Sequence, residues 1–311
     1  MTDDPNPAGL KIGVALGGGA ARGWAHLGVL EALEERGIVP EVVSGASIGA
    51  LVGAALAGGR LDALTSWVLD LRRIDVLKLL DASIGGGVIE GNRVMRAIED
   101  ILLERDIGEL ELPFGAVATD LHQGRTVWLR SGSTIRAVRA SCAMPGLFPA
   151  VRHQGAWLVD GGLVDPVPVT LCRMLGADVV IAVNLSPYRH RLARLRRPPA
   201  APDDTVAGQV RREESSYLER LQAMVANLFD GDDDADREPA LLDVVSSAIN
   251  IMQERVTRSR LAGDPPEIEI VPDVQDIALM DFHRASLALD RGRRAVEDRA
   301  AEIERLASGA A

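Results

Sequence analysis

A serine flanked by two glycines, in the stretch Gly45-Ala46-Ser47-Ile48-Gly49, constrains the fold of this chain more than any other feature. The pattern Gly-x-Ser-x-Gly is typical of a sharp turn that joins the end of a strand to the start of a helix and exposes the serine hydroxyl. Residues 38–43 predict a short buried strand, and residues 48–56 predict a helix packed closely on a sheet. A glycine-rich turn in which Ser47 only caps the helix fits the same pattern.

A glycine-rich loop precedes this turn by about thirty residues. Residues 10–16 predict a first strand, residues 17–23 are small except for Arg22, and residues 24–36 predict a helix. The backbone N–H groups of such a loop converge on an anion, either a dinucleotide pyrophosphate or the oxyanion of an acyl transfer. The glycines match the dinucleotide fingerprint only loosely, and Glu41 is a poor candidate for the acid that binds the ribose. An oxyanion accounts for both the loop and the serine turn.

A nucleophilic serine needs a base, and the chain offers both histidines and an aspartate. The histidines are His26, His122, His153, His190 and His283. His283 suits the chain order of an α/β-hydrolase, but it opens a strongly charged predicted helix. Asp160 follows a predicted strand over residues 156–159 and precedes Gly161-Gly162, so its carboxylate can approach another backbone closely. The same Asp-Gly-Gly stretch also fits a tight hairpin in which the glycines supply positive φ angles.

Taken in this order, the glycine-rich loop with Arg22, the serine turn and Asp160-Gly161-Gly162 resemble the bacterial patatin-like phospholipase family. Residues 141–149 match the block that this family places just before its Asp-Gly-Gly motif. Residues 86–91 and 281–285 are similar to blocks of its neuropathy-target-esterase-like branch. The resemblance covers residues 10–184 strongly and residues 241–292 more weakly. It implies an α/β protein with a three-layer α/β/α patatin-like fold and a mostly parallel central sheet.

The resemblance also implies a Ser–Asp dyad, in which Ser47 attacks a lipid acyl ester and Asp160 takes its proton. The amides that would hold the oxyanion are those of Gly18, Gly19 and Ala20. The residues that would support this loop are Gly17, Arg22 and Gly23, and those that would shape the two turns are Gly45, Gly49, Gly161 and Gly162. The family usually has glycine where Ala20 stands, so the approach of substrate is narrower here. No cofactor or metal is implied.

The dyad also makes a physical demand on the aspartate. A free aspartate has a pKa near ~4 and is a weak base for an alcohol, so apolar neighbours such as Val159, Leu163 and Val164 would have to raise it. An acyl chain needs an apolar slot, which we expect to be lined by Trp24, Met144, Leu147 and Phe148.

Composition narrows the setting. A net charge of −11 and only ten aromatic residues argue against a nucleic-acid partner. Cys142 and Cys172 lie in apolar stretches without metal-ligand spacing, which predicts buried, reduced thiols. The acidic N-terminal residues are unlike a signal peptide, and the apolar run at 48–59 is too short to span a bilayer. We therefore expect a cytoplasmic protein that contacts lipid substrate and touches the inner membrane surface peripherally.

We expect one acyl-hydrolase domain over residues 8–311, with a mobile insertion at 187–239 and a C-terminal helix–strand–helix that completes it. The insertion has an arginine-rich part, a possible helix at 214–229 and an acidic run at 230–236 that predicts a solvated linker. Further helices are predicted at 60–80, 92–103, 241–261 and 283–306, and further strands at 117–119, 126–129, 179–183 and 268–271. Two other functions stay open: a regulatory or scaffold protein on the same fold, and a nucleotide-binding protein that uses residues 17–23.

Overall fold

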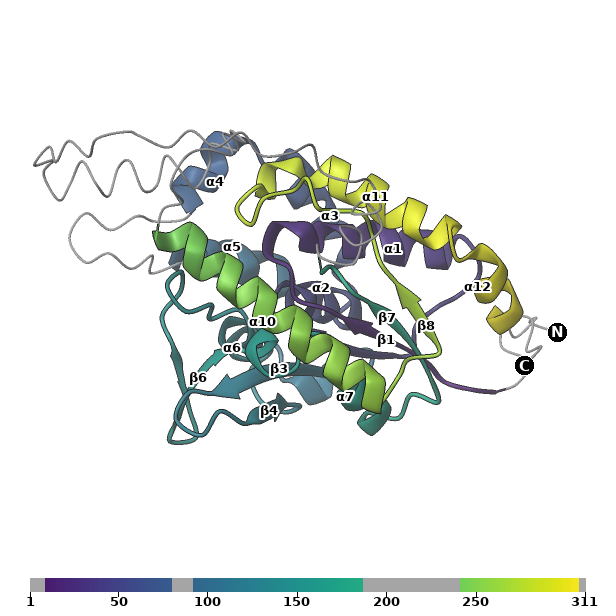
Figure 1. Ribbon diagram of the computed structural model, residues 1–311, viewed down its shortest axis with the longest axis horizontal. Helices are drawn as coiled ribbons and strands as arrows, with labels where there is room; N and C mark the ends of the chain where they lie inside the picture. Colours follow the sequence, from purple (N-terminus) through teal and green to yellow (C-terminus); the bar gives the residue numbers. More distant parts are fainter. Residues whose placement is uncertain (1–8, 80–91, 187–240, 308–311) are drawn as a thin grey trace, which may run out of the picture.

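A mixed eight-stranded sheet forms the centre of the computed structural model, which describes residues 9–79, 92–186 and 241–307 (Figure 1). The predicted insertion at 187–239, with its helix and acidic run, and the block at 86–91 lie outside the described residues. The strand order is β5-β6-β3-β2-β1-β7-β8, and β4 pairs with β3 outside this path. The strands are β1 (Ile12–Leu16), β2 (Val42–Ala46), β3 (Phe114–Asp120), β4 (Thr126–Leu129), β5 (Val151–His153), β6 (Ala156–Asp160), β7 (Val179–Val183) and β8 (Ile268–Ile270).

The sheet is mostly parallel, as the sequence predicts. The neighbours β3, β2, β1, β7 and β8 all pair in parallel, whereas β4 and β6 pair with β3 in antiparallel fashion and β5 does so with β6. Strands β1, β2, β3 and β7 are buried along their whole length, which explains their continuous apolar runs.

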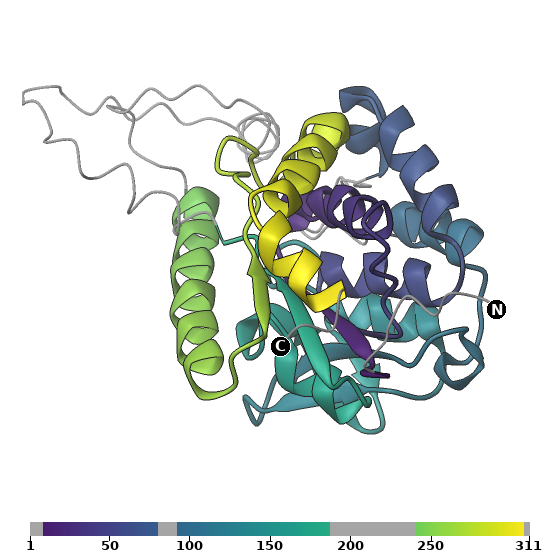
Figure 2. The same cartoon turned by 90° about the vertical axis from the view of Figure 1, so that its right-hand side faces the viewer.

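Helices cover both faces of the sheet and make a three-layer α/β/α arrangement (Figure 2). Helices α1, α2, α6 and α11 pack on one face, and α7 with the C-terminal end of α10 packs on the other. The helices are α1 (Ala25–Glu34), α2 (Ile48–Ala57), α3 (Leu61–Asp70), α4 (Arg73–Leu79), α5 (Asn92–Leu102), α6 (Thr134–Ser141), α7 (Val169–Met174), α10 (Leu241–Gly263), α11 (Ala285–Glu297) and α12 (Ala300–Ala307). Short 3₁₀ turns are η1 (Ala20–Trp24), η2 (Ile107–Glu109), η3 (Gly161–Leu163) and η4 (Phe282–Arg284). Among the described helices, none has the length and apolarity that crossing a bilayer requires.

Three predicted helices differ in detail from the structure. Residues 60–80 form two helices, because Leu71 adopts an extended conformation between α3 and α4. The helix predicted from residue 24 is preceded by the 3₁₀ turn η1. The helix predicted over 283–306 is broken between α11 and α12, where the guanidinium of Arg299 donates to the carbonyl oxygen of Glu269 on the edge strand β8. Periodicity alone does not reveal such breaks, because the apolar spacing continues across them.

Helices α1 and α11 cross at very short range. A methyl group at Gly28 would lie 2.0 Å from the carbonyl oxygen of Leu289, and one at Gly292 would lie 2.1 Å from that of Ala25. Only glycine fits at either position, so α11 lies directly against α1, the helix that follows the glycine-rich loop.

Candidate active site

Ser47 occupies the turn between β2 and α2 in a strained backbone conformation, with φ 54° and ψ −125°. The turn is so tight that a methyl group at Gly45 would lie 2.3 Å from the carbonyl oxygen of Gly49, and one at Gly49 would lie 2.1 Å from that of Leu16. The backbone N–H of Ser47 donates to the Oγ of Ser141 at 2.8 Å. The predicted strand–turn–helix is confirmed. The simple helix-cap alternative is wrong, because the Ser47 side chain makes no cap hydrogen bond.

Strand register brings Asp160 to this turn. Strand β2 pairs with β3 as far as Ala46, which lies opposite Val117, and the next residue of β3, Ala118, lies opposite Asp160 of β6. Because β4 occupies the other edge of β3 over residues 116–119, β2 and β6 follow one another along the same edge. Ser47 directly follows β2 and Asp160 ends β6, so the two residues meet where these strands stop.

The carboxyl group of Asp160 is buried, with 1 % of the residue exposed. Its Oδ1 accepts from the N–H of Gly162 at 2.7 Å, while Oδ2 has no hydrogen-bond partner among the described residues. Neither Gly161 nor Gly162 has a positive φ, because the chain continues into η3, so the tight-hairpin alternative is wrong. Glycine is still required at 161, where a methyl group would lie 2.1 Å from the carbonyl oxygen of Val117.

Burial raises the pKa of Asp160 to about 6, and the Ser47 hydroxyl and the Gly162 N–H each offset part of that rise. Strand register places the Ser47 hydroxyl beside this carboxyl group, although Oδ2 has no well-aligned donor in the described part of the chain. Loosely aligned contacts of this kind are common before substrate binds. A carboxylate with this pKa is a stronger base near neutral pH than an exposed aspartate.

The glycine-rich loop lies against Ser47, since a methyl group at Gly18 would lie 3.6 Å from the Cβ of Ser47. The N–H of Gly17 donates to the carbonyl oxygen of Val183, and the N–H of Gly18 donates to the carbonyl oxygen of Pro166, both at 3.0 Å. Two of the loop's amides are therefore already used, including that of Gly18, which the family resemblance implies as an oxyanion donor. The N–H groups of Gly19 and Ala20 have no acceptor among the described residues.

Ala20 has a φ of 48°, a conformation that favours glycine. This explains why the family usually has glycine at this position. Alanine here strains the backbone in addition to narrowing the approach of substrate.

A C-terminal segment holds the loop in place. The Nε of Arg22 donates to the carbonyl oxygen of Ile277 at 3.0 Å, and the N–H of Ala21 donates to that of Leu279 at 3.2 Å. The indole N–H of Trp24 donates to the carbonyl oxygen of Phe282 at 3.1 Å. Arg22 thus supports the loop as expected from the sequence, but its partner lies in a segment to which the sequence had assigned no part in the site. Gly23 lets the loop reach α2, since a methyl group there would lie 2.2 Å from the Cγ2 of Ile48.

His26 of α1 supports the same loop through a hydrogen bond to its first residue. Its ring is fully buried and its Nε2 lies 2.8 Å from the carbonyl oxygen of Gly17, which only accepts hydrogen bonds. Burial lowers the pKa of His26 to about 4, so the ring is neutral and carries its proton on Nε2. The sequence offered His26 only as a possible base. No sequence signal distinguishes that use from the support role that the structure shows.

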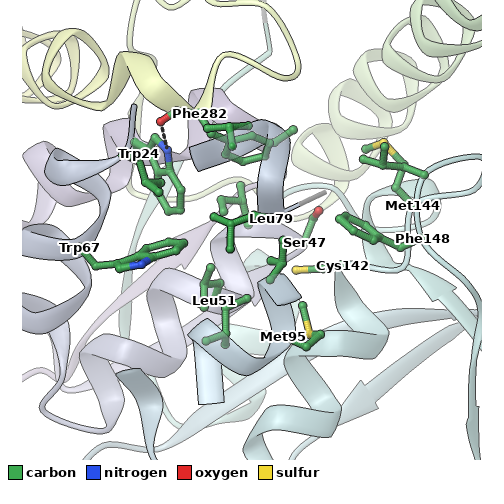
Figure 3. Close-up of a pocket in the computed structure, with 17 residues that line it drawn as sticks. Trp24, Ser47, Leu51, Trp67, Leu79, Met95, Cys142, Met144, Phe148 and Phe282 are labelled. Carbon is green, nitrogen blue, oxygen red and sulfur yellow. Dashed lines mark hydrogen bonds between the residues drawn. The ribbon is translucent and has the colours of Figure 1, made fainter. Parts of the chain in front are cut away.

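An apolar cavity opens beside Ser47 (Figure 3). Its walls come from η1, α2, α3, α4, α5, the loop after α6 and η4, and Ser47 is the polar member of the lining. The four expected lining residues, Trp24, Met144, Leu147 and Phe148, are all confirmed. The sequence missed the contribution of α3, α4, α5 and the link between α3 and α4, which supply Trp67, Leu71, Val76, Leu79, Val94, Met95 and Ile98.

The side chains nearest to Ser47 in this cavity include Cys142, whose thiol points toward the serine (Figure 3). Burial raises the pKa of Cys142, so the thiol is protonated. No histidine of the described residues lines the cavity, and His283 lies in η4 outside it. Within the described ranges, no group of three or more His, Cys, Asp or Glu side chains could hold a metal ion.

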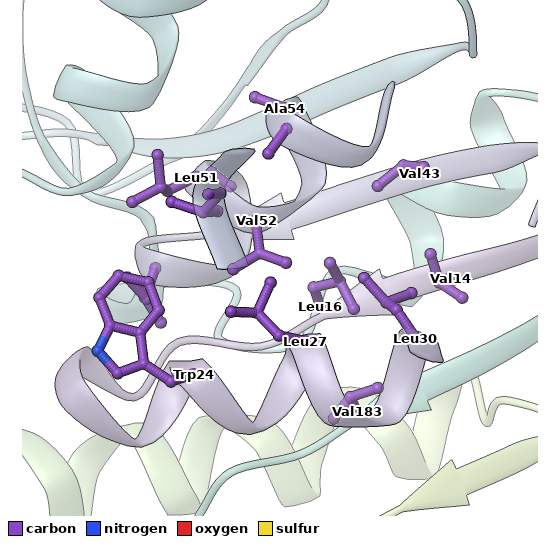
Figure 4. Close-up of a cluster of buried hydrophobic side chains, with 14 of the residues drawn as sticks. Val14, Leu16, Trp24, Leu27, Leu30, Val43, Leu51, Val52, Ala54 and Val183 are labelled. Atoms are coloured by element: carbon purple, nitrogen blue, oxygen red, sulfur yellow. The ribbon is translucent and has the colours of Figure 1, made fainter. Parts of the chain in front are cut away.

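The elements that carry Ser47 and His26 share one hydrophobic core (Figure 4). Val14 and Leu16 of β1 meet Leu27 of α1 and Val52 of α2 there, and all four are fully buried. The site is therefore built on rigid, close-packed elements rather than on free loops.

Comparison with known proteins agrees with this geometry. A sequence model described as patatin-like phospholipase matches residues 14–173. An uncharacterized NTE family protein of Mycobacterium tuberculosis is 33% identical over 341 aligned residues, which cover 93% of each chain. Lysophospholipase NTE1 of Mycosarcoma maydis is 36% identical over 192 residues, covering 57% of this chain but 10% of that protein. The crystal structure of VipD from Legionella pneumophila superimposes with a TM-score of 0.50 at 17% identity, covering 93% of this chain and 67% of that one.

Proposed function

This chain belongs to the patatin-like phospholipase family, and we propose that it hydrolyses the acyl esters of lipids with Ser47 as nucleophile and Asp160 as base. The observation that carries the proposal is the strand register that ends β2 and β6 side by side, next to an apolar cavity that Ser47 lines. The name of the relative from Mycosarcoma maydis, a lysophospholipase, supports a lipid ester as substrate.

The reaction would proceed in two halves. The Oγ of Ser47 attacks the ester carbonyl while its proton passes to the carboxylate of Asp160, and the C–O bond to the alcohol then breaks as that alcohol takes the proton. Water attacks the acyl-serine in the second half, with Asp160 again taking a proton, and the fatty acid leaves as Ser47 is restored.

The N–H groups of Gly19 and Ala20 are the donors that we assign to the oxyanion. They are unpaired among the described residues and belong to a loop that contacts Ser47. One such donor contributes roughly 3 to 4 kcal/mol to catalysis in other hydrolases. The alkoxide of an ester needs less help to leave than an amine does, so a dyad without an imidazole suits esters better than peptides.

Two substitutions test the dyad. Ser47→Ala and Asp160→Asn should abolish hydrolysis of a long-chain p-nitrophenyl ester while the thermal melt stays cooperative. The matched controls are Ser44→Ala, whose hydroxyl donates to the carbonyl oxygen of Pro168, and Asp165→Asn, which does not line the cavity. Normal turnover by a folded Ser47→Ala or Asp160→Asn chain would end the proposal.

A fluorophosphonate probe separates this proposal from a regulatory or scaffold function on the same fold. The probe should label the parent chain at Ser47 and fail to label Ser47→Ala. A parent chain that folds but resists the probe would favour the scaffold, and tight binding of NAD or ATP by residues 17–23 would favour a nucleotide-binding protein.

A further inference from the structure

Residues 121–159 form a strongly basic segment in a chain whose net charge is −11. The segment has no aspartate or glutamate, and its basic residues are Arg125, Arg130, Arg136, Arg139 and Arg152, with His122 and His153. It spans the β3–β4 connection, β4, α6 and most of the β5–β6 hairpin. Such a local excess of one charge needs a reason in an otherwise acidic protein.

The fold gathers part of this segment into one patch, which we call the hairpin surface: Leu121, Arg125, Arg136, Arg152 and Trp157. Arg136 on α6 donates to the carbonyl oxygen of Arg152 on β5. The guanidinium of Arg152 lies 5.9 Å from the ring centre of Trp157 on β6. The N–H of Leu121 donates to the carbonyl oxygen of Trp157 at 2.8 Å.

The hairpin surface carries apolar side chains in the open. Leu121 is 51% exposed and Trp157 is 40% exposed, next to the exposed side chains of Arg136 and Arg152. Tryptophan beside arginine is typical of protein surfaces that rest in the interfacial layer of a bilayer.

Acidic neighbours cancel little of this charge. Asp120 is buried and lies 3.4 Å from Arg125, so this one arginine is partly neutralised. Glu104 accepts from Ser133, which caps α6 one turn before Arg136. Among the described residues, no carboxylate forms an ion pair with Arg136 or Arg152, so these two arginines carry the charge of the surface.

Short stretches of chain join the hairpin surface to the wall of the apolar cavity. Trp157 lies three residues before Asp160 on the same strand. The loop that leads from α6 to β5 contributes Cys142, Met144, Leu147 and Phe148 to the cavity wall. Figure 1 shows β6 at the same end of the molecule as the N-terminal ends of α5 and α10.

We propose that the hairpin surface docks this protein on an anionic lipid bilayer, so that a lipid can pass from the membrane directly into the cavity. This inference rests on the proposed function for its reason but not for its test. The arginines would pair with lipid phosphates, and Trp157 with Leu121 would enter the interfacial layer. The exposed apolar side chains and the adjoining apolar cavity favour a bilayer over an acidic protein.

The test uses the full chain carrying Ser47→Ala, so that no lipid is consumed. Its sedimentation with vesicles of equal parts phosphatidylcholine and phosphatidylglycerol is compared with that on phosphatidylcholine alone. Each arginine near an anionic surface contributes about fivefold to partitioning, so Arg136→Gln with Arg152→Gln should weaken binding to the mixed vesicles ~25-fold at low salt. The matched control is Arg294→Gln with Arg305→Gln, on α11 and α12.

Several results would overturn the docking surface: equal binding to both kinds of vesicle, undiminished binding by the Arg136/Arg152 variant, or an equal loss in the control. Hydrolysis of monodisperse p-nitrophenyl butyrate by the chain with Ser47 intact reports the proposed function separately. Hydrolysis without vesicle binding refutes docking alone, and vesicle binding without hydrolysis refutes the proposed function alone. If the Arg136/Arg152 pair proves necessary only for capture of an acidic protein, the surface has a different partner and the proposal fails.

Discussion

Hydrolysis should fall with an apparent pKa close to 6 as the solution is acidified. Asp160 must be ionised to take the proton of Ser47, and burial raises its pKa to about 6. About nine-tenths of the carboxyl groups are then ionised at pH 7 and about one-tenth at pH 5. The initial kcat/KM for a soluble ester should therefore drop about tenfold between these two pH values, whereas an ordinary aspartate would leave it nearly unchanged.

A second buried aspartate provides the control. Burial also raises the pKa of Asp165 to about 6, but this residue faces Arg260 at 3.7 Å and does not line the cavity. The variant Asp165→Asn should keep the same midpoint in the pH profile. A flat profile between pH 5 and pH 7, or a midpoint that moves when Asp165 is replaced, would refute the assignment of the base.

Stability must be measured beside activity, because the buried groups act on it in opposite directions. The folded pKa of Asp160 and Asp165 lies above the unfolded value, so their contribution to the free energy of unfolding grows as the pH falls from about 6 toward 3.8. The pKa of His26 is about 4 in the folded state and 6.5 in the unfolded state. Its contribution to the free energy of unfolding is therefore complete above pH 6.5 and is lost as the pH falls from 6.5 toward 4. Activity that falls at pH 5 while the melt stays cooperative reports the base rather than unfolding.

Three further predictions concern the loop and the cavity. His26→Leu should leave the Gly17 carbonyl buried without a donor, which costs about 1 to 3 kcal/mol of stability and lowers kcat more than it changes KM. His26→Gln should restore much of the lost stability and of the lost kcat. Equal losses in the two variants would contradict the support role. Ala20→Gly should raise the free energy of unfolding by about 1 kcal/mol in denaturant titrations, because glycine adopts the positive φ of this position without strain. A lower free energy of unfolding would show that the packing of the methyl group matters more. Leu51→Trp should fill the cavity and depress hydrolysis of long-chain p-nitrophenyl esters relative to short ones, and an unchanged ratio would place the acyl chain elsewhere.

The serine turn could be predicted because its cause is local. Gly45 and Gly49 are required by atoms a few residues away or on the adjoining strand, and their spacing is visible in the sequence. The alternation of strands and helices is similarly local, which explains why the sheet and most helices were predicted. Asp160 was singled out by a motif and a family resemblance, not by physics. Its position beside Ser47 depends on β2 and β6 sharing one edge of β3, which no local pattern encodes.

Long-range contacts account for most of what the sequence did not reveal. The amide of Gly18 looks free in the sequence, but the structure pairs it with Pro166, nearly 150 residues away. The support of the loop by Ile277 and the wall that Trp67 contributes to the cavity have the same character. Residues that meet only after the chain has folded leave no periodic signal along it.

The brace on Arg22 has a consequence for the order in which this protein matures. Arg22 and Ile277 are 255 positions apart, and Trp24 and Phe282 are 258 apart. A ribosome synthesises Ser47 and Asp160 long before it reaches either carbonyl partner. A nascent chain can thus carry both reactive side chains while the loop beside them still lacks these braces, which become available only after more than 250 residues beyond the loop have been made.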